Sequence, residues 1–413
     1  MKTLVVLGGA DGAITTIRTA RRIGLHTLCV DQRRDAPAVP DADEFLAVST
    51  RDGERLVATL ADRDDLAGVV SPASDVNLPT QFLLADRLGL PSGLSAAALR
   101  ASLDKGFFRA VCDRLGQPGP RYVQGPPDRV RSAAAGLPFP VVVKPTDASG
   151  GRGITLCRAP QEVPAAVDVA AAQSASGVVI AEEYLTGTHY TAEAVVRDGR
   201  VALLGLGRRV MTPPPYFVTV THLMPGAPAA LAEQVRGLLD DACRAMRYRW
   251  GSLNADVLVT DDQRVVLVEL GARLGGNGSA ELLGLVNDVD VTEAYVRAAV
   301  GDPPALRARA SACAAFQALS AERPGTLVAI HGLSALRALP GVVETVISAS
   351  PGDPVEPYRR AGAKVGYVLV TAADCERLQE TLARIDVLVH VEVTPEPSSR
   401  DQRRRLPAAA TPS

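Results

Sequence analysis

The stretch LNADVLVTDDQRVVLVELGARLGGNG (residues 253–278) consists of two apolar runs, a polar connection and a glycine-rich tail that contains an arginine. The DDQ connection has the composition of a turn, so the two runs are predicted to form a β-hairpin. A loop with an even number of residues would set Asp261 opposite Arg264. The same register would set Asp256 opposite Glu269, where like charges about 4.5–5.5 Å apart repel each other.

Two opposed carboxylates on otherwise apolar strands require a cation between them. Mg²⁺ suits this arrangement because one or two carboxylates hold it, and waters and nucleotide phosphates complete its shell. Asp256 and Glu269 are therefore the predicted metal ligands. A register shifted by one residue would instead turn one acid towards solvent, and this alternative stays open.

A second element precedes the hairpin, in VVVKPTDASGGRGI (residues 141–154). Lys144 ends a predicted strand, and a loop of small residues follows. Consecutive small residues let backbone N–H groups approach phosphate oxygens, and such a loop can close as a lid. The lysine adds a point charge for a phosphate. No G-x-x-x-x-G-K-[ST] P-loop occurs in the chain, and a plain turn is the alternative interpretation of this loop.

A third element is VVIAEEYLTGTHY (residues 178–190), an apolar run that ends in EEYL. The end of such a strand presents backbone N–H and C=O groups between Tyr184 and Leu185. These groups can hydrogen-bond an adenine ring while apolar side chains sandwich it.

The first hundred residues alternate between apolar runs and helical patterns, which predicts a parallel sheet with helices on both faces. Gly8, Gly9 and Gly12 follow the first strand, but their spacing does not match the G-x-G-x-x-G dinucleotide fingerprint. Asp31 and Asp75 end two of the strands, and turn capping is their expected role, ahead of a place on the substrate side.

Beyond about Pro120 the pattern changes to longer, mostly antiparallel strands, and a third region follows residue 302. This third region has expected strands near 313–320, 341–348 and 363–371 and a helix at 373–385. The last residues, 396–413, are rich in Pro, Ser and Ala around a basic patch and are expected to form a disordered tail.

Composition limits the choice of partners. The 413 residues are 47% hydrophobic, 22% charged and carry a formal net charge of -2, which gives no reason to expect nucleic acid or an acidic membrane as a partner. Six scattered cysteines without a C-x-x-C pair favour reduced thiols. No targeting or membrane-spanning segment is recognisable, so we expect a cytoplasmic protein.

A lysine-ended strand, a glycine lid, a strand ending in EEYL and two carboxylates on later strands follow one another in a single order. That order resembles the ATP-grasp superfamily, over Met1 to about Val300 and more weakly to about residue 392. The resemblance implies an α/β and α+β fold. Its expected domains are a Rossmann-like domain (1–100), an ATP-grasp domain (101–302) with a small lid subdomain (about 120–186), and a C-terminal α+β domain packing on the active site (303–395).

The resemblance also implies an ATP site. Lys105, in LDKGFFRAVCDRLGQPGPRY, would reach the phosphates, and Lys144 would lie at the mouth of the adenine pocket. His189 occupies a position that is commonly a ribose-binding glutamate. The full set implied for ATP binding is Lys105, Lys144, Ser149, Gly150, Gly151, Glu182, Glu183, Leu185 and His189.

Two segments, RRVMTPPPYFVTVTHLMPGAP (208–228) and ELGARLGGNG (269–278), resemble the carboxylate–amine ligase branch that includes bacterial L-amino acid (dipeptide) ligases. In that branch a histidine like His222 faces the substrates, and an arginine and glycine like Arg273 and Gly276 contact the acyl phosphate and product. A basic residue before TPPPYF also contacts phosphate, and Arg208 or Arg209 stands there.

The chain departs from the E-x-N pattern of many superfamily members, because Gly271 stands where the asparagine would help to bind a second metal. The amino-acid ligase branch often has a small residue there. Asn277 is a candidate substitute ligand.

The resemblance implies a ligase that joins a carboxylate to an amine as an amide, with an amino acid as the expected carboxylate substrate. The reaction would pass through an acyl phosphate and release ADP. It implies ATP and one or two Mg²⁺ ions, which Mn²⁺ can replace, and it is compatible with a homodimer. Three alternatives remain open: a purine-pathway or carboxylase-type ATP-grasp enzyme, a non-catalytic nucleotide-binding protein, and a NAD(P) oxidoreductase.

Overall fold

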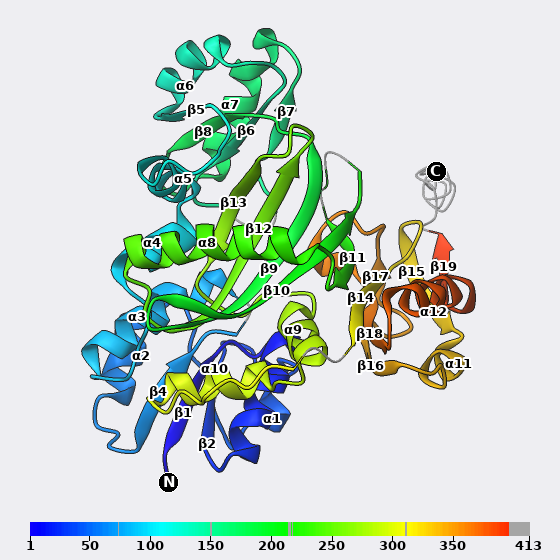
Figure 1. The fold of residues 1–413 in the computed structure, drawn as a ribbon. Helices are drawn as coiled ribbons and strands as arrows, with labels where there is room; N and C mark the ends of the chain where they lie inside the picture. Colours follow the sequence, from blue (N-terminus) through cyan, green and yellow to red (C-terminus); the bar gives the residue numbers. More distant parts are fainter. Residues whose placement is uncertain (73, 149–150, 214–215, 217, 310–311, 396–413) are drawn as a thin grey trace, which may run out of the picture. The chain divides into compact units, whose positions relative to one another are not determined.

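The computed structural model describes residues 1–72, 74–148, 151–213, 216, 218–309 and 312–395 (Figure 1). The chain falls into two units. Unit 1 comprises Met1–Val210 and His222–Phe316, and unit 2 comprises Met211–Thr221 and Gln317–Ser413. Among the described residues, no helix combines the length and the apolar character needed to span a membrane.

Unit 1 begins with a parallel four-stranded sheet. Its strands are β1 (Thr3–Leu7), β2 (His26–Val30), β3 (Glu44–Leu46) and β4 (Leu66–Val70), in the order β3-β2-β1-β4. The sheet is parallel, as the alternating pattern predicts, and its strands bury residues such as Val5, Leu28 and Val69. The accompanying helices are α1 (Ile14–Arg22), α2 (Gly53–Leu60), α3 (Leu78–Arg87) and α10 (Val291–Ala299).

Helix α10 comes from far along the chain, yet it packs against α1 and β4 (Figure 1). The ion pair between Arg22 and Glu293, 2.9 Å, joins α10 to α1. The sequence pattern of the first hundred residues gives no sign of this helix, because its partners lie more than 200 positions away.

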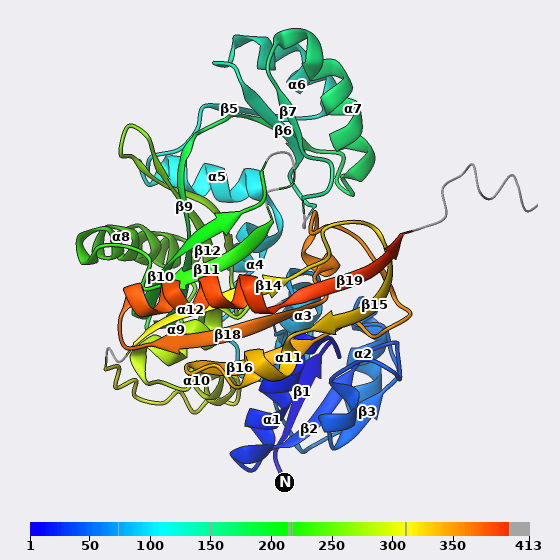
Figure 2. The same cartoon turned by 90° about the vertical axis from the view of Figure 1, so that its right-hand side faces the viewer.

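The second sheet of unit 1 is antiparallel, with order β5-β8-β6-β7. Its strands are β5 (Tyr122–Gly125), β6 (Val141–Pro145), β7 (Thr155–Cys157) and β8 (Val179–Glu183). Helices α6 (Pro127–Ala133) and α7 (Val163–Gln173) pack along it (Figure 2). β6 and β7 form the two arms of the predicted glycine hairpin, and Lys144 is the last residue but one of β6, one position before the strand end.

The central sheet of unit 1 runs β13-β12-β9-β10. Its strands are β9 (Gly187–Arg197), β10 (Arg200–Met211), β12 (Gly251–Thr260) and β13 (Val265–Gly271). Three helices, α4 (Ala96–Leu103), α5 (Lys105–Arg114) and α8 (Ala229–Met246), share one apolar core with this sheet, and Figure 1 shows α8 lying across the strands. Alternate residues such as Glu193, Asn254 and Asp256 are absent from that core, since successive strand residues point to opposite faces. Helix α9 (Ser279–Asn287) contacts β9.

The hairpin of β12 and β13 pairs Asp256 with Glu269, as predicted, although the predicted route to that pairing is wrong. Thr260, and not Asp261, donates its backbone N–H to the Arg264 carbonyl at 2.9 Å, so the turn register is one residue off. A β-bulge between Asp256 and Val257 shifts the pairing by one residue and brings Glu269 opposite Asp256.

Unit 2 contains a three-stranded sheet with order β17-β15-β19 and a separate pairing of β16 with β18. The predicted strands near 341–348 and 363–371 correspond to β16 and β18, and the predicted helix corresponds to α12, which packs on β18 (Figure 2). The three strands of the β17-β15-β19 sheet were not predicted. The elements are β15 (Gly325–His331), α11 (Leu333–Arg337), β16 (Val342–Ile347), β17 (Pro354–Val355), β18 (Gly366–Ala372), α12 (Cys375–Leu388) and β19 (His390–Pro395).

The chain passes between the units near the end of β10, within β11 (Thr219–Met224) and within β14 (Cys313–Leu319). The strand β14 was predicted near 313–320. The cysteine prediction needs one correction. Free, buried thiols are found at Cys29, Cys112, Cys157 and Cys243. Cys313 and Cys375 are disulfide-bonded, so the expectation of reduced thiols is wrong for these two. The predicted tail, 396–413, lies outside the described residues.

Candidate active site

A buried ion network lies at the end of β6. The Lys144 ammonium lies 2.5 Å from one carboxylate oxygen of Glu182, and the Arg109 guanidinium donates to the other at 3.1 Å. Arg109 also donates to the backbone carbonyls of Leu267 and Val268 on β13. Burial alone raises the pKa of Glu182, but Lys144 and Arg109 outweigh it and lower this pKa to about 2. The carboxylate is thus fully engaged, so any adenine contact of Glu182 goes through its backbone.

Replacing Glu182 by Gln is expected to destabilise the protein by about 3–5 kcal/mol, because two buried cations lose their shared counter-charge. Denaturant unfolding measures this loss. Since the pKa of Glu182 falls from 4.5 to about 2 on folding, the stabilisation is present above pH 4.5 and is lost as the pH falls towards 2. Glu183→Gln is the matched control. A loss no larger than the control's would contradict the network's importance.

Lys105 connects the base of the glycine hairpin to the acidic pair. It opens α5, where the Asp104 side chain caps the helix by accepting from the Phe107 N–H at 3.1 Å. Its ammonium donates to the Ala148 carbonyl at 2.8 Å and lies 3.5 Å from Glu269. Two other predicted phosphate contacts, Ser149 and Gly150, lie outside the described residues.

Among the remaining residues predicted to bind ATP, Gly151 has a φ of 77°, which favours glycine. Glu183 and Leu185 lie at and just beyond the end of β8, both partly exposed. The backbone N–H of Glu183 donates to the Arg121 carbonyl at 2.8 Å, so it is already engaged within the sheet region.

Cations surround the acidic pair. Arg209 contacts the Asp256 carboxylate at 2.5 Å, which selects Arg209 over the exposed Arg208 as the basic residue facing the site. Loss of hydration favours a raised pKa for Glu269, even though half of its side chain is exposed. The cations Lys105, Lys144, Arg273 and Arg209 together outweigh this effect and lower the pKa. This excess of positive charge around two acids is suited to a polyanion such as a nucleotide triphosphate.

The donor set fits Mg²⁺. Within the described residues, no cluster of three or more His, Cys, Asp or Glu side chains is arranged to hold a metal. This described part of the chain therefore offers an opposed pair, Asp256 and Glu269, and no complete protein cage. Mg²⁺ is the ion that accepts one or two carboxylates and takes its other ligands from phosphates and water. Asn277, in the left-handed region at φ 54°, stays a predicted further ligand.

His189 lies on the same strand as Thr191, which pairs with Asp256 in register. Burial lowers the pKa of His189, Arg209 lowers it further, and Asp256 partly opposes them. The imidazole is therefore neutral at pH 7 and can both donate and accept a hydrogen bond, as the predicted ribose contact requires.

Arg273 forms a bidentate ion pair with Asp75 of the first sheet. Its Nε and Nη2 donate to the two carboxylate oxygens at 2.8 and 2.9 Å, and Nη1 donates to the Leu274 carbonyl at 3.2 Å. The capping role expected for Asp75 is therefore wrong, whereas Asp31 does accept from the nearby Arg33 N–H at 2.9 Å. Gly276 is exposed, and a Cβ placed there would meet no atom within 4 Å.

Glu193 is a buried site residue that the sequence reasoning missed. Its carboxylate accepts from the Gly275 N–H at 3.0 and 3.1 Å, from Asn254 at 2.9 Å and from Ser279 at 2.9 Å. It thereby holds the backbone of the loop that carries Arg273. A Cβ at Gly275 would lie 2.2 Å from Glu193, so only glycine fits there. The one available signal was an acid within the apolar run TAEAVV.

Burial raises the pKa of Glu193 to about 7, against the hydrogen bonds that lower it. The folded protein therefore keeps a proton that the unfolded chain loses near pH 4.5. Its stabilising contribution is full below pH 4.5 and is lost as the pH rises through 7, a change on the order of 3 kcal/mol. Unfolding free energies of wild type and Glu193→Gln should thus converge or cross over this range. Parallel curves would contradict the raised pKa.

His222 is buried, with 4% of its surface exposed, and its ring lies 6.0 Å from that of Phe316. Burial first, and Arg209 second, lower its pKa to about 3, so it stays neutral and does not act as a proton donor at pH 7. Within the described part of the chain, its Nδ1 is buried without a hydrogen-bond partner.

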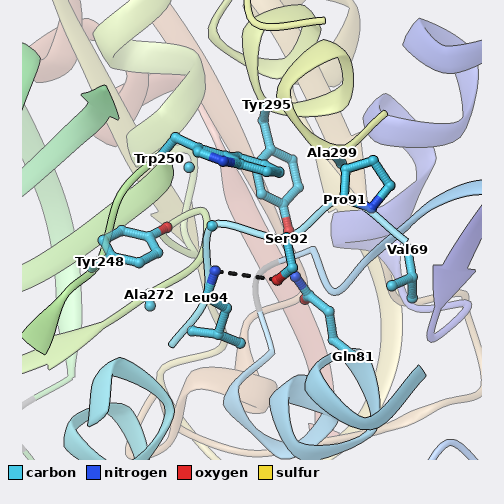
Figure 3. A pocket seen from close by; sticks show the side chains of 12 residues that line it. Val69, Gln81, Pro91, Ser92, Leu94, Tyr248, Trp250, Ala272, Tyr295 and Ala299 are labelled. Carbon is cyan, nitrogen blue, oxygen red and sulfur yellow. Dashed lines mark hydrogen bonds between the residues drawn. The ribbon is translucent and has the colours of Figure 1, made fainter. Parts of the chain in front are cut away.

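A separate small cavity lies behind the Arg273 loop, with Gln81, Trp250, Ala272 and Tyr295 in its wall (Figure 3). None of the 12 lining residues is a predicted site residue. Ala272 lines this cavity and directly follows Gly271 in the chain, so the cavity wall and the site share this part of the backbone.

Two regions of the chain match known protein families. Residues 137–281 match the family model described as "ATP-grasp domain", and residues 317–394 match "L-amino acid ligase C-terminal domain 2". The uncharacterized protein y4rH of Sinorhizobium fredii is 28% identical over 406 residues, covering 95% of this chain and 83% of that protein. A formate-dependent phosphoribosylglycinamide formyltransferase of Pelobacter propionicus is 27% identical over 316 residues, 73% of this chain and 75% of that protein.

Solved structures share the fold. The L-amino acid ligase from Bacillus licheniformis superposes with a TM-score of 0.84 at 17% identity, covering 95% of this chain and 99% of that one. Phosphoribosylglycinamide synthetase from Anaerococcus prevotii gives 0.78 at 19% identity, covering 95% and 100%. The predicted mixed α/β and α+β fold is confirmed. Residues 137–281 therefore form an ATP-grasp domain, and the chain is similar to ATP-grasp carboxylate–amine ligases.

Proposed function

We propose that this enzyme joins the carboxylate of an amino acid to an amine through an acyl phosphate, releasing ADP and phosphate. The observation that carries the proposal is the opposed pair of Asp256 and Glu269 inside a set of four cations, with Arg273 among them. The C-terminal match to the L-amino acid ligase domain supports an amino acid as the carboxylate substrate.

The nucleotide would lie between the two lysines and the acidic pair. Lys105 and Lys144 would contact its phosphates, the end of β8 would take adenine, and His189 would contact ribose. Bound Mg²⁺ on Asp256 and Glu269 would neutralise phosphate charge. Phosphoryl transfer needs positioning and charge stabilisation more than covalent chemistry from the protein, so these contacts account for most of the expected catalysis.

Arg273 would stabilise the oxyanion that forms when the amine attacks the acyl phosphate. Among the described residues, Asp75 and Leu274 use three of its five N–H groups, which leaves two for this anion. The open space at Gly276 would admit the substrates, and His222 would contact them as a neutral hydrogen-bonding group.

Several further expectations belong to the proposal. They are the division into domains at 1–100, 101–302 and 303–395, closure of the loop 147–153 as a lid, Asn277 as a metal ligand, replacement of Mg²⁺ by Mn²⁺, a homodimer, and a cytoplasmic location.

A second candidate function comes from the relatives named as formate-dependent phosphoribosylglycinamide formyltransferases, of which two cover about 94–95% of this chain at 24% identity. Formate is also a carboxylate, and the same nucleotide site would serve it. A purine-pathway role would then replace the amino-acid substrates.

The two functions are separated by a substrate screen on the full chain. Purified protein with ATP and Mg²⁺ receives pairs of amino acids, formate with phosphoribosylglycinamide, or bicarbonate with an amine, while ADP release is followed. Mass spectrometry identifies the products. We expect ADP and a dipeptide-like amide only with amino acids. ADP release with formate and phosphoribosylglycinamide alone would establish the second candidate.

A further inference from the structure

Asp75 begins the short 3-10 helix η3 (Asp75–Asn77) that follows β4, at the carboxyl end of the first parallel sheet. Its partner Arg273 is 198 residues away in the chain. Ligands of parallel sheets bind at this edge, where the strand order changes direction. The two side chains are 25% and 15% exposed, so the pair is partly shielded from water and is worth more than a surface ion pair.

Described residues on both sides of Asp75 are held by hydrogen bonds. Tyr295 of α10 approaches the backbone N–H and carbonyl of Ser71 at 3.3 and 3.4 Å, and the Ser71 hydroxyl donates to the Ser74 carbonyl at 2.8 Å. Asn77 donates to the Leu7 carbonyl at the end of β1, 2.8 Å. Figure 3 shows Tyr295 from the side of the cavity. The residues Ser71, Ser74 and Asn77, which flank Asp75, are therefore held in place.

Gly271 is the residue whose size permits the pair. A Cβ there would lie 3.1 Å from Asp75 Oδ1 and 3.2 Å from Arg273 Cζ, closer than most real Cβ contacts. An asparagine, with three more heavy atoms, would occupy space next to the ion pair. The departure of this chain from the E-x-N pattern thus has a structural counterpart, since Asp75 and Arg273 lie against the position that the asparagine would fill.

Without Asp75, Arg273 has other acids to approach. Burial on its own lowers the pKa of Arg273, but Asp75 raises it, and Glu193 and Glu269 add to this effect through charge. Glu269 is a predicted metal ligand, and Glu193 supports the loop backbone. A guanidinium released from Asp75 would move towards either acid and away from the direction that its two remaining N–H groups now face.

We propose that Asp75 is a positioning residue for this reaction: it holds one edge of the Arg273 guanidinium so that the remaining N–H groups meet the acyl phosphate and the oxyanion formed from it. The proposal rests on the proposed function. Asp75 touches no reacting atom, so its whole effect on the rate passes through Arg273. Misplacement of a catalytic group by about 1 Å can cost about 10²-fold in rate.

The test is a kinetic double-mutant cycle on the full chain with four proteins: wild type, Asp75→Asn, Arg273→Ala and the double variant. Hydroxylamine traps the acyl phosphate as a hydroxamate, so acyl transfer is measured with one amino acid and no second substrate. We expect Asp75→Asn to lower kcat about 10–100-fold, with the KM for ATP changed less than about threefold. In the Arg273→Ala background the same substitution should change kcat less than twofold.

Asp41→Asn is the matched control, because Asp41 makes the same bidentate contact with Arg18, 2.9 and 3.1 Å, on the exposed surface of the same domain. It should leave kcat unchanged. Additive losses in the cycle would overturn the inference, because they would show that Asp75 acts independently of Arg273. Equal activity of the wild type and Asp75→Asn would overturn the inference but leave the proposed function standing. A wild type that gives no hydroxamate with any amino acid would overturn the proposed function and, with it, the inference.

Discussion

Replacing Glu269 by Gln is expected to lower the rate of ADP formation at least about 10³-fold, to the limit of detection. The carboxylate lies opposite Asp256 and among Lys105, Lys144, Arg209 and Arg273. A neutral amide would neither hold Mg²⁺ nor offset these cations, and a metal contributes several kcal/mol to stabilising transition-state charge. Each 1.36 kcal/mol corresponds to a factor of ten in rate. The measurement is ADP release at saturating ATP and Mg²⁺.

The fold should survive this change, because the Glu269 side chain is 49% exposed. Thermal unfolding of the Glu269→Gln protein, compared with that of wild type, therefore serves as the control for folding. Asp262→Asn, an exposed acid in the turn of the same hairpin, is the matched control for charge and should keep full activity. Turnover of Glu269→Gln within tenfold of wild type would show that the metal site lies elsewhere.

Replacing Arg273 by Ala is expected to lower kcat about 10²–10³-fold, the typical cost of one lost donor to a developing oxyanion. The KM for ATP should change little, because the hydrogen bonds of Arg273 within the described residues go to Asp75 and Leu274 and not to the lysines or the end of β8. Steady-state kinetics with varied ATP and amino acid separate the two parameters.

Arg273→Lys provides a second variant that keeps a positive charge beside Asp75 and so preserves stability. Lysine cannot reproduce the bidentate fork of a guanidinium, so activity should stay low. Restoration of more than about half of the wild-type kcat by lysine would reduce the role of Arg273 to that of a simple charge.

The sequence predicted those parts of the site that depend on local pattern. Lys144 at a strand end, the glycine hairpin and the opposed acids follow from strand periodicity and turn composition. The pairing of Asp256 with Glu269 was right although the turn register was not, because a bulge next to Asp256 compensates. Bulges of one residue leave no clear mark in an apolar strand, so this compensation was not predictable.

The parts that were missed depend on contacts between distant segments. Glu193 sits in an apolar strand and is understandable only once the Gly275 backbone is seen against it. Asp75 and Arg273 are 198 residues apart, and no period or spacing connects them. Arg109 lies in a segment with a helical sequence pattern, yet its guanidinium joins β8 to β13. Contacts of this kind depend on how distant segments pack in three dimensions, so they could not be predicted from a single sequence.

The central claim, that the reaction passes through an acyl phosphate, is tested most directly by an isotope experiment. Wild-type protein turns over an amino acid labelled with ¹⁸O in its carboxylate, together with ATP, Mg²⁺ and an amine. An acyl phosphate transfers one carboxylate oxygen to the phosphate, so we predict one ¹⁸O atom in each released inorganic phosphate, with ADP as the other product. Release of AMP that carries the label, together with unlabelled pyrophosphate, would contradict the account.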